Sequence, residues 1–486
     1  MSSYIVELPL KTEKYQDDIL EKRFEIAGNI YNALVNVTQK RYREMVKTRK
    51  YRSLVESLSG NAKKDRPIWK EINTMRREYG LTEYSFHKDV SDMQKHFKEN
   101  IDSHTAQKIA SALWKSYEKL FYGNGKKVHY KRYGEIQTLE SKTNASGIKF
   151  RNNKIYWNKL IIPVVIDYSN PYEILALKDR VKYCRIKRRY IKGKYKYYVH
   201  LVLEGTPPQK VDTNTGEIKR DIGTGEVGLD IGTSTIAISG RTAVRILELA
   251  DKVRVLENEK RKLLRKMDRS RRATNPDNFN DDGTIKKQGS KKVTWIKSNH
   301  YIKLQGRLRE IYRKQADVRK YQHECLANEI ISLGDIIYVE KMSFSGLKKR
   351  AEKTETNEKG KFKRKKRFGK SIGNKAPAML LDIIDRKLNY YGKSLIEINT
   401  KEARASQFNH FEETYKKKKL TQRWNNFNGI KVQRDMYSAF LIMNISEDLK
   451  TFDLTKCNDR FEEFKRMHDL EAERLSGNRN LSSIAI

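Results

Sequence analysis

The sequence is poor in cysteine and proline and has no long apolar run. Its three cysteines, Cys184, Cys325 and Cys457, lie too far apart to form a Cys-x-x-Cys pair, which excludes a disulfide framework and a four-cysteine zinc site. The nine histidines form no HExxH or His-x3-His motif, so histidine-based metal chemistry is not expected. No stretch reaches the roughly 18 apolar residues of a membrane span, and the strand-like opening residues 1–8 show no signal-peptide pattern. We therefore expect structural thiols and a cytoplasmic protein.

Negative charge is scarce relative to positive charge. The chain has 102 Lys and Arg residues against 61 Asp and Glu residues, so its formal net charge is +41. Such an excess predicts a polyanionic partner, since solubility requires much less. With 486 residues, of which 37% are hydrophobic, the chain is long enough for about three domains with apolar cores. The composition thus indicates a folded protein that binds nucleic acid.

The first half of the chain changes its pattern twice. Residues 1–14 contain a strand, and residues 15–120 carry apolar residues at three- and four-residue spacing, which predicts a helical lobe. This lobe is either a clamp for a duplex or a solvated bundle. Residues 121–222 show short alternating strands with Gly and Asn turns, which predicts a small β-barrel. Within it, residues 183–203 are expected to form a hairpin with one packed face and one polar face.

Basic residues accompany tyrosines in the predicted barrel. This mixture suits contact with phosphates and bases, although an ordinary half-exposed strand would show the same alternation. The candidate nucleic-acid contacts of this region are Lys126, Lys127, Lys131, Arg132, Arg185, Lys187 and Arg188.

A segment rich in Gly, Thr and Asp, residues 212–224, indicates a linker before a further α/β domain. Strands over residues 227–231 and 235–239 are expected to open that domain. A basic helical hairpin over residues 247–333 follows, and then a strand that ends at Glu340.

A basic low-complexity stretch, residues 348–370, comes next. Such a run is usually solvent-facing. Because this one lies between two of the candidate catalytic segments described below, we predict that it contacts nucleic acid through side chains that include Lys363 and Arg364.

Three acidic residues lie in apolar segments that are far apart in the sequence. Asp230 lies within a continuous strand pattern, with Gly228 and Gly232 on the same face. Glu340 ends an apolar strand, and Asp435 falls in the first turn of a predicted helix. Each has an ordinary explanation, as a turn Asp, a solvated strand-end Glu and a helix-capping Asp. The two glycines are expected to leave room for a ligand backbone beside the first acid.

Two strands and a helix that present acids toward one point predict a site for two Mg²⁺ ions. Hard carboxylate ligands suit Mg²⁺ or Mn²⁺ better than zinc. Two such ions activate a water molecule and stabilise the leaving oxygen of a phosphodiester. Asp230, Glu340 and Asp435 are therefore the candidate catalytic and metal-ligating residues.

In their order and in their residues, these segments resemble the motifs of the RuvC-like nuclease domain of the TnpB transposon-encoded proteins and of the compact type V CRISPR effectors. Residues 228–233 (GLDIGT) are similar to the first RuvC motif, residues 337–341 (IYVEK) to the second, and residues 434–439 (RDMYSA) to the third. The upstream lobe, the barrel and the helical hairpin also follow the family plan, so the resemblance covers most of residues 1–445.

The resemblance implies an RNA-guided, Mg²⁺-dependent DNA endonuclease that cuts guide-matched double-stranded DNA next to a short motif with one RuvC-like centre. Its partners would be guide RNA and target DNA, with the protein a monomer or a homodimer on one guide and nucleoid-associated when bound to DNA. The fold would be multidomain α+β. The first part of the chain would contain a helical recognition domain (15–120) and a wedge domain, which consists of a first strand (1–14) and a β-barrel (121–222). An RNase H-like (RuvC) α/β nuclease domain (223–399) would follow and would include a basic lid region (344–372). The remaining parts would be a target-loading insert (400–430), the third motif (431–446) and a partly disordered C-terminal extension (447–486).

The sequence departs from the family pattern in two places. Most relatives carry a four-cysteine zinc finger between the second and third motifs, whereas residues 400–424 contain no cysteine, so no zinc is expected there. The insert could still load the target strand through residues 416–419, Arg423 and Trp424. Tyr437 stands where many relatives have Asn, which is expected to alter the surroundings of the metal.

Two other functions share many of these features. An RNA-guided DNA-binding protein without cleavage would typically have lost an acid, whereas all three acids are present. A DNA transposase would share the acids but would act at specific element ends without RNA.

Overall fold

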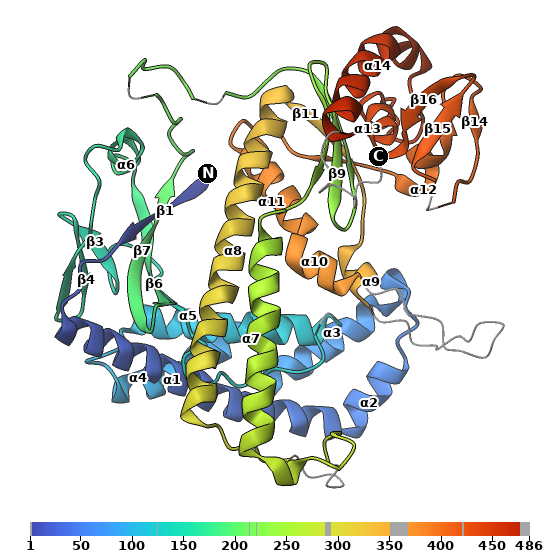
Figure 1. Cartoon of the computed structure of the whole chain (residues 1–486). Helices are drawn as coiled ribbons and strands as arrows, with labels where there is room; N and C mark the ends of the chain where they lie inside the picture. Colours follow the sequence, from blue (N-terminus) through green and yellow to red (C-terminus); the bar gives the residue numbers. More distant parts are fainter. Residues whose placement is uncertain are drawn as a thin grey trace. The chain divides into compact units, whose positions relative to one another are not determined.

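The computed structural model of the chain divides into two compact units, Met1–Asn214 and Thr215–Ile486, which are taken separately below (Figure 1). The division falls inside the segment expected to be a linker. The residues that the structure describes are 2–123, 125–212, 214–219, 221–286, 293–349, 368–419 and 422–476. Helices and several sheets occur together, so the fold is mixed α+β as predicted. None of the helices in these ranges is long and apolar enough to cross a membrane.

Five helices occupy most of the first 121 residues of unit 1, which confirms the predicted helical pattern. Three of them begin directly after Asn61, Thr82 and Asp102, whose side chains accept hydrogen bonds from backbone N–H groups of the first turn. The helices are α1 (Lys14–Lys47), α2 (Arg49–Glu56), α3 (Ala62–Glu78), α4 (Glu83–His96) and α5 (Ser103–Phe121).

Two antiparallel sheets make up the β structure of unit 1. The larger has the order β1-β7-β6-β2, from β1 (Ser3–Pro9), β2 (Thr138–Glu140), β6 (Val181–Ile191) and β7 (Lys194–Glu204). The smaller contains β3 (Lys149–Arg151), β4 (Lys154–Trp157) and β5 (Leu160–Pro163), and α6 (Pro171–Ala176) follows it.

The predicted closed barrel is absent from the described part of unit 1. The two sheets are linked by an isolated bridge between Leu10 and Val164. Strand β2 spans only three residues and leaves most of the edge of β6 unpaired, so the ladder does not close.

The predicted hairpin is confirmed as β6 and β7. Its turn is formed by Lys192 and Gly193, with φ angles of 47° and 87°. Tyr197, Val199 and Leu201 are buried on one face, as the alternation predicted.

Unit 2 is built on a five-stranded sheet with the order β10-β9-β8-β11-β12. The strands are β8 (Glu226–Ile231), β9 (Thr235–Ser239), β10 (Val244–Glu248), β11 (Ile336–Glu340) and β12 (Ile396–Ile398). Strands β8, β9 and β10 pair antiparallel, whereas β8, β11 and β12 pair parallel. The three predicted strands are thus confirmed, and β10 and β12 are additional.

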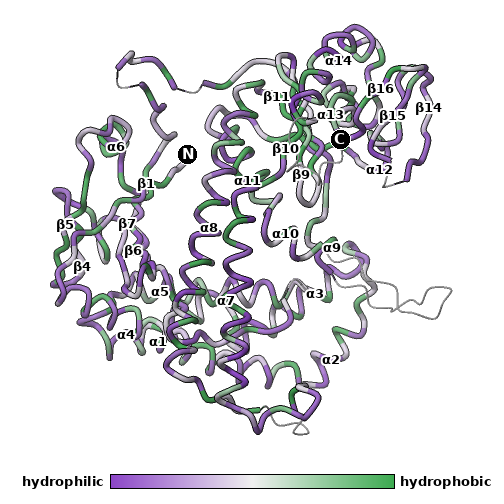
Figure 2. Tube along the Cα trace, viewed as in Figure 1, coloured by the Kyte–Doolittle hydropathy of each residue, from purple (hydrophilic) through white to green (hydrophobic). Residues whose placement is uncertain are grey.

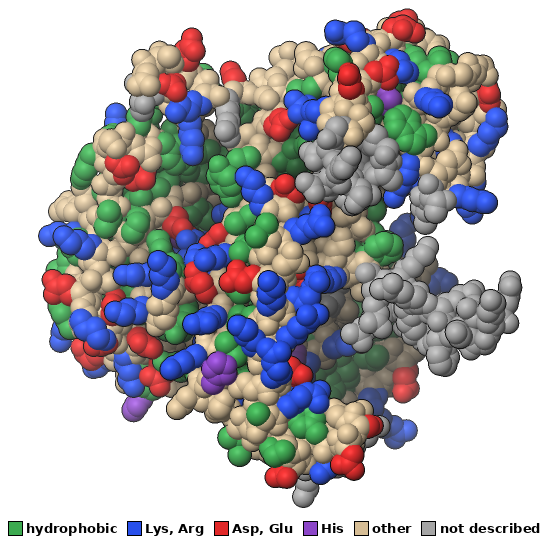
Figure 3. All heavy atoms as spheres, viewed as in Figure 1, with side chains coloured by type: hydrophobic (Ala, Val, Ile, Leu, Met, Phe, Trp, Pro, Cys, Tyr) green, Lys and Arg blue, Asp and Glu red, His purple; other side chains and the backbone are tan. Residues whose placement is uncertain are grey.

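Helices cover one face of this sheet and also form the predicted helical hairpin. Ile330 of α8 and Leu380 of α11 pack with Val227 and Leu229 of β8 in one core. Helices α7 and α8 are mostly hydrophilic, and Lys and Arg side chains gather over them (Figures 2 and 3). The elements are α7 (Val253–Thr274), η1 (Pro276–Asn278), α8 (Asn299–Leu333), α9 (Phe344–Lys348), α10 (Gly369–Lys375) and α11 (Pro377–Asn389).

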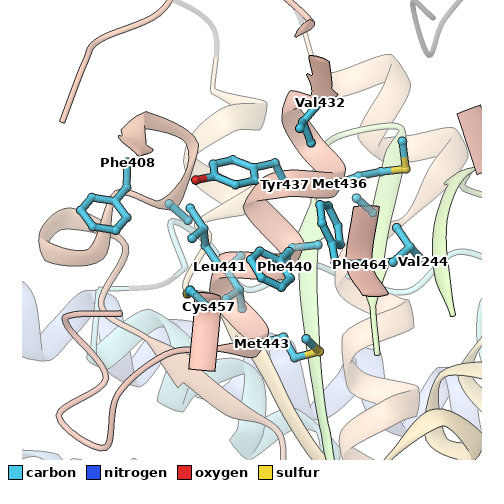
Figure 4. Packing of buried hydrophobic residues seen from close by; sticks show 14 of the residues in the cluster. Val244, Phe408, Val432, Met436, Tyr437, Phe440, Leu441, Met443, Cys457 and Phe464 are labelled. Carbon is cyan, nitrogen blue, oxygen red and sulfur yellow. The ribbon is translucent and has the colours of Figure 1, made fainter. Parts of the chain in front are cut away.

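Two further helices and the insert pack in a second core of unit 2. These helices are α13 and α14. Phe440 of α13 and Phe464 of α14 lie together, with ring centroids 4.4 Å apart (Figure 4). The elements are α12 (Thr400–Ala403), η2 (Ala405–Gln407), β13 (Phe408–Asn409), β14 (Thr414–Tyr415), β15 (Trp424–Phe427), β16 (Ile430–Gln433), α13 (Arg434–Met443) and α14 (Leu454–Ser476).

The C-terminal extension contains more ordered structure than its polar composition suggested. Helix α14 buries Cys457, Phe461 and Phe464, which recur at the three- and four-residue spacing of a packed helix face. Glu471, also buried, accepts a 3.0 Å hydrogen bond from the backbone N–H of Ile246 in β10. Helix α14 is therefore part of the core of unit 2.

Candidate active site

The three candidate acids lie in one pocket of unit 2. The pocket has a volume of about 580 Å³ and is lined by Asp230, Glu340 and Asp435 together with basic and small polar residues. Strands β8 and β11 are parallel neighbours, with Val339 opposite Leu229, so their carboxyl ends lie at the same edge of the sheet. The predicted convergence of the acids is confirmed.

Gly228 lets α13 approach this edge closely. A Cβ atom on Gly228 would lie 2.1 Å from the carbonyl oxygen of Ala439 and 2.4 Å from the backbone nitrogen of Met443. The space beside Asp230 that was expected to admit a ligand is therefore filled, on the Gly228 side, by the backbone of α13. Gly232 instead lines the pocket. A Cβ atom added to Gly232 would lie 3.5 Å from the nearest atoms, which belong to Thr235.

Burial and mutual repulsion disfavour the ionised forms of two of the acids. Burial raises the pKa of Glu340 to about 7. Burial, and then the charges of Glu340 and Asp435, raise the pKa of Asp230 well above its ordinary value. The charge of Arg434 and a hydrogen bond with Ser438 oppose this shift only in part. Without a cation, the pocket thus favours protonated carboxyl groups.

Asp435 differs from the other two acids because arginines neutralise it. Nε and Nη2 of Arg434 donate to its Oδ1 at 3.0 and 2.9 Å, and Nη1 of Arg423 lies 3.4 Å from its Oδ2. The side chain of Gln433, the residue before Arg434, accepts a 2.8 Å hydrogen bond from the backbone N–H of Met436 and so caps α13. The chain therefore fixes this carboxylate before any ligand arrives.

Helix α14 fixes the start of α13 in turn. The backbone N–H of Gln433 donates to Nε2 of His468 at 2.9 Å, and this imidazole is fully buried. Burial lowers the pKa of His468, which favours the neutral ring that this acceptor role requires. No motif in the sequence marks His468 as part of the site's support.

The donor set of the pocket fits a divalent cation. Carboxylate oxygens are the ligands that Mg²⁺ and Mn²⁺ prefer, and a cation would relieve the repulsion that raises the pKa of Asp230. Within the described ranges, no group of three or more His, Cys, Asp or Glu side chains is close enough to hold a metal ion as it stands. The chemistry of the site thus suits a metal, whereas the spacing here is not that of a closed ligand shell.

The predicted nucleic-acid contacts of unit 1 lie in two places. The segment between α5 and β2 exposes Lys126, Lys127, Lys131 and Arg132. On the polar face of β6, the half-buried Arg185 is paired with Glu140 at 2.5 Å, and Lys187 lies 3.6 Å from Glu7. The first group is available to phosphates, whereas the second already has acidic partners.

Arg188 does not lie on a surface that nucleic acid could reach. It is only 2% exposed, and its guanidinium lies 4.4 Å from the ring centroid of Phe24 and 4.5 Å from that of Tyr195. Alternation along β6 places it on the packed face, where its role is to fill the core of unit 1. This placement corrects the expected phosphate contact.

In the insert, Arg423 lines the pocket, whereas Trp424 packs edge-on against His468 with ring centroids 5.9 Å apart. Trp424 thus contacts the core of unit 2 and is only partly exposed. The predicted contacts Lys363 and Arg364 lie outside the described residues.

Tyr437 connects α13 to the insert and does not line the pocket. Its buried hydroxyl lies 2.6 Å from Nδ1 of His410 and accepts the backbone N–H of the same residue at 3.2 Å. Tyr437 lies in the buried hydrophobic cluster with Phe440 (Figure 4). In place of the expected effect on the surroundings of the metal, Tyr437 links α13 to the insert.

Replacing Tyr437 with Phe is expected to destabilise unit 2 by about 1–3 kcal/mol, because two buried polar groups of His410 lose their partner. Chemical denaturation of the purified protein measures this change. The half-exposed Tyr391 supplies the control, since Tyr391→Phe should leave the free energy of unfolding almost unchanged. Equal stability of the two variants would show that the His410 link contributes nothing.

No protein-family model and no curated protein matches the chain. Among solved structures, it is similar to a Cas12f1–sgRNA–target DNA complex, with a TM-score of 0.46, 12% identity, and coverage of 88% of this chain and 82% of that chain. It is also similar to a CRISPR-Cas12f ternary complex (TM-score 0.27, 14% identity, 89% and 82% covered) and to the mini-RNA-guided endonuclease CRISPR-Cas_phi3 (TM-score 0.31, 10% identity, 92% and 92% covered). All three TM-scores are below 0.5.

Proposed function

We propose that the chain is an RNA-guided, Mg²⁺-dependent DNA endonuclease with one nuclease centre at the pocket of Asp230, Glu340 and Asp435. The observation that carries this proposal is the convergence of three acids from distant segments in a pocket that basic side chains also line. Each acid alone has an ordinary explanation, but the repulsion of the buried Asp230 by both Glu340 and Asp435 in one pocket calls for a cation.

The sheet of unit 2 supports an RNase H-like (RuvC) nuclease domain beginning near residue 223. Three antiparallel strands continue into two parallel ones, with the first and second acids on the adjacent central strands β8 and β11. The helices of unit 1 would then form the recognition domain, its sheets the wedge domain, and residues 400–430 the target-loading insert.

The chain's own residues would prepare the site for the metal. Asp230, Glu340 and Asp435 would hold Mg²⁺, which when bound supplies an activated water and stabilises the leaving oxygen of the phosphodiester. Arg434 and Arg423 fix the third acid in orientation. Glu340, with a pKa near 7, exchanges a proton close to neutral pH in the metal-free protein.

The guide requirement rests on charge and on motif order. A net charge of +41 suits a guide RNA and a heteroduplex, which present many more phosphates than one short DNA site. Sequence choice would then belong to base pairing, while the protein reads duplex shape and a short adjacent motif.

Sequencing of RNA that co-purifies with the full chain tests this proposal. A DNA target that matches the RNA, flanked by a randomised motif, should be cut in Mg²⁺ and remain intact in EDTA. A complex that binds its matched target without cutting it would instead be an RNA-guided DNA-binding protein. Cutting of specific DNA ends by RNA-free protein would indicate a transposase.

A further inference from the structure

One lysine of the insert stands apart from its neighbours. Lys417 and Lys418 both line the pocket of the three acids, from the segment between β14 and β15. Lys417 and Lys419 are exposed, and the exposed Lys416 forms an ion pair with Glu412 at 2.9 Å. Lys418 is half-buried, and its Nζ is inaccessible to solvent.

The ammonium group of Lys418 has no hydrogen-bond partner among the described residues. Its Nζ lies 5.7 Å from the centroid of the ring of Phe427. Burial, and then the charge of Arg434, lower the pKa of Lys418. An ammonium has three protons to donate, so leaving it desolvated and unpaired is costly.

The acids of the pocket do not supply the missing partner. Asp435 is already held by two arginines, and no ion pair joins Lys418 to any of the three acids in the described structure. A partner from outside the described chain would have to be an acceptor, because Lys418 can only donate, and an anion compensates the desolvated positive charge best. The acids would repel an anion, so an attractive group at the pocket wall is needed to bring one close.

We propose that Lys418 binds a phosphate of the DNA strand that is to be cut, through a non-bridging oxygen, and so positions that strand at the three acids. This inference rests on the proposed function. Lysine acts on phosphate as a point charge, and a buried one gains more from such a pair than an exposed one does. The insert thus contributes a specific substrate-binding side chain.

A pair of variants separates this role from general positive charge. Lys418→Met removes the ammonium and keeps the apolar contact with Phe427. Lys431→Met removes an equal charge from an exposed lysine of β16 that does not line the pocket. With the complete RNA–protein complex at saturating matched target, Lys418→Met should cut about 10- to 100-fold more slowly, the loss expected for one hydrogen bond to a charged group. Lys431→Met should stay within about twofold of the parent rate, and Lys418→Arg should recover most of the rate that Lys418→Met loses.

A neutral phosphate identifies the partner. When a methylphosphonate replaces the phosphate at the mapped cleavage position, or one of its two neighbours, cutting by the parent protein should slow, while Lys418→Met should show no further loss at the position that Lys418 contacts. An equal additional loss in both proteins at all three positions would overturn the assignment.

Stability distinguishes substrate binding from a structural role. Because Lys418→Met removes a desolvated charge, the metal-free variant should melt at or above the temperature of the parent. A slower variant with a lower melting temperature would mean that Lys418 acts through folding. If the parent complex cuts no target at all, the proposed function fails; if it cuts and Lys418→Met cuts equally fast, only the role of Lys418 fails.

Discussion

Replacing Asp230 with Asn is expected to abolish cleavage of a matched target and, at the same time, to stabilise the metal-free protein. Cleavage should fall by roughly four orders of magnitude, as is typical when a central catalytic group is removed. Stability should rise because Asp230 is destabilised by burial and by the charges of Glu340 and Asp435. Loss of function with gain of stability is the signature of a site that is strained without its cation.

The stabilisation should depend on pH in a defined direction. Since the folded protein raises the pKa of Asp230, the folded state binds its proton more tightly than the unfolded state does. The contribution of Asp230 to the free energy of unfolding is therefore highest at low pH and falls as the pH rises through the folded-state pKa. The difference between Asp230→Asn and the parent should be small at pH 5 and larger at pH 8.

Thermal melting in EDTA at these two pH values, together with a cleavage assay in Mg²⁺, measures both effects. Asp459 on α14 is exposed, so Asp459→Asn supplies the control and should change neither melting nor cleavage. An Asp230→Asn protein that loses cleavage and also melts lower would show that the carboxylate is structural.

A second large effect is expected from Gly228→Ala, which alters no acid. The added Cβ would meet backbone atoms of Ala439 and Met443 at 2.1 and 2.4 Å, and no side-chain rotation can relieve contacts with backbone. Helix α13 must then move away from β8, and it carries Asp435 with it. We expect a loss of about 3 kcal/mol or more in stability and loss of cleavage.

Denaturant unfolding, with circular dichroism as the probe, reports the stability change. Gly306 in α8 is the matched control, because a Cβ there would meet no atom within 4 Å. Gly306→Ala should stabilise the protein by about 0.5–1 kcal/mol through its better helix propensity. Normal stability and cleavage in Gly228→Ala would refute the close approach of α13 to β8.

The acids could be found from the sequence because their signals are local. A strand pattern that continues through Asp230, an apolar strand that ends at Glu340 and a helix that starts beside Asp435 are each readable within about ten residues. Their convergence then follows from the motif order. The helical hairpin was predictable for the same reason, since its periodicity extends over many turns.

The support of the site could not be found in this way because it depends on contacts between distant segments. The role of His468 depends on its contact with Gln433, which no sequence motif predicts. The absence of a side chain at Gly228 suggested room for a ligand, whereas the backbone of α13 fills that space. Arg188 carries the charge of a phosphate contact, but its strand turns it inward. The prediction of a closed barrel was wrong because β2 is only three residues long, and the sequence pattern does not determine the length of this strand.

Helix α14 has a consequence for how the protein is made. Until Glu471 leaves the ribosome, the N–H group of Ile246 lacks its acceptor and Phe440 lacks the covering ring of Phe464. At roughly 5–20 residues per second, the interval between synthesis of Asp230 and of Glu471 is on the order of tens of seconds. During that interval the packing that holds the acid-bearing segments together is incomplete, so the proposed nuclease centre would assemble only late in synthesis.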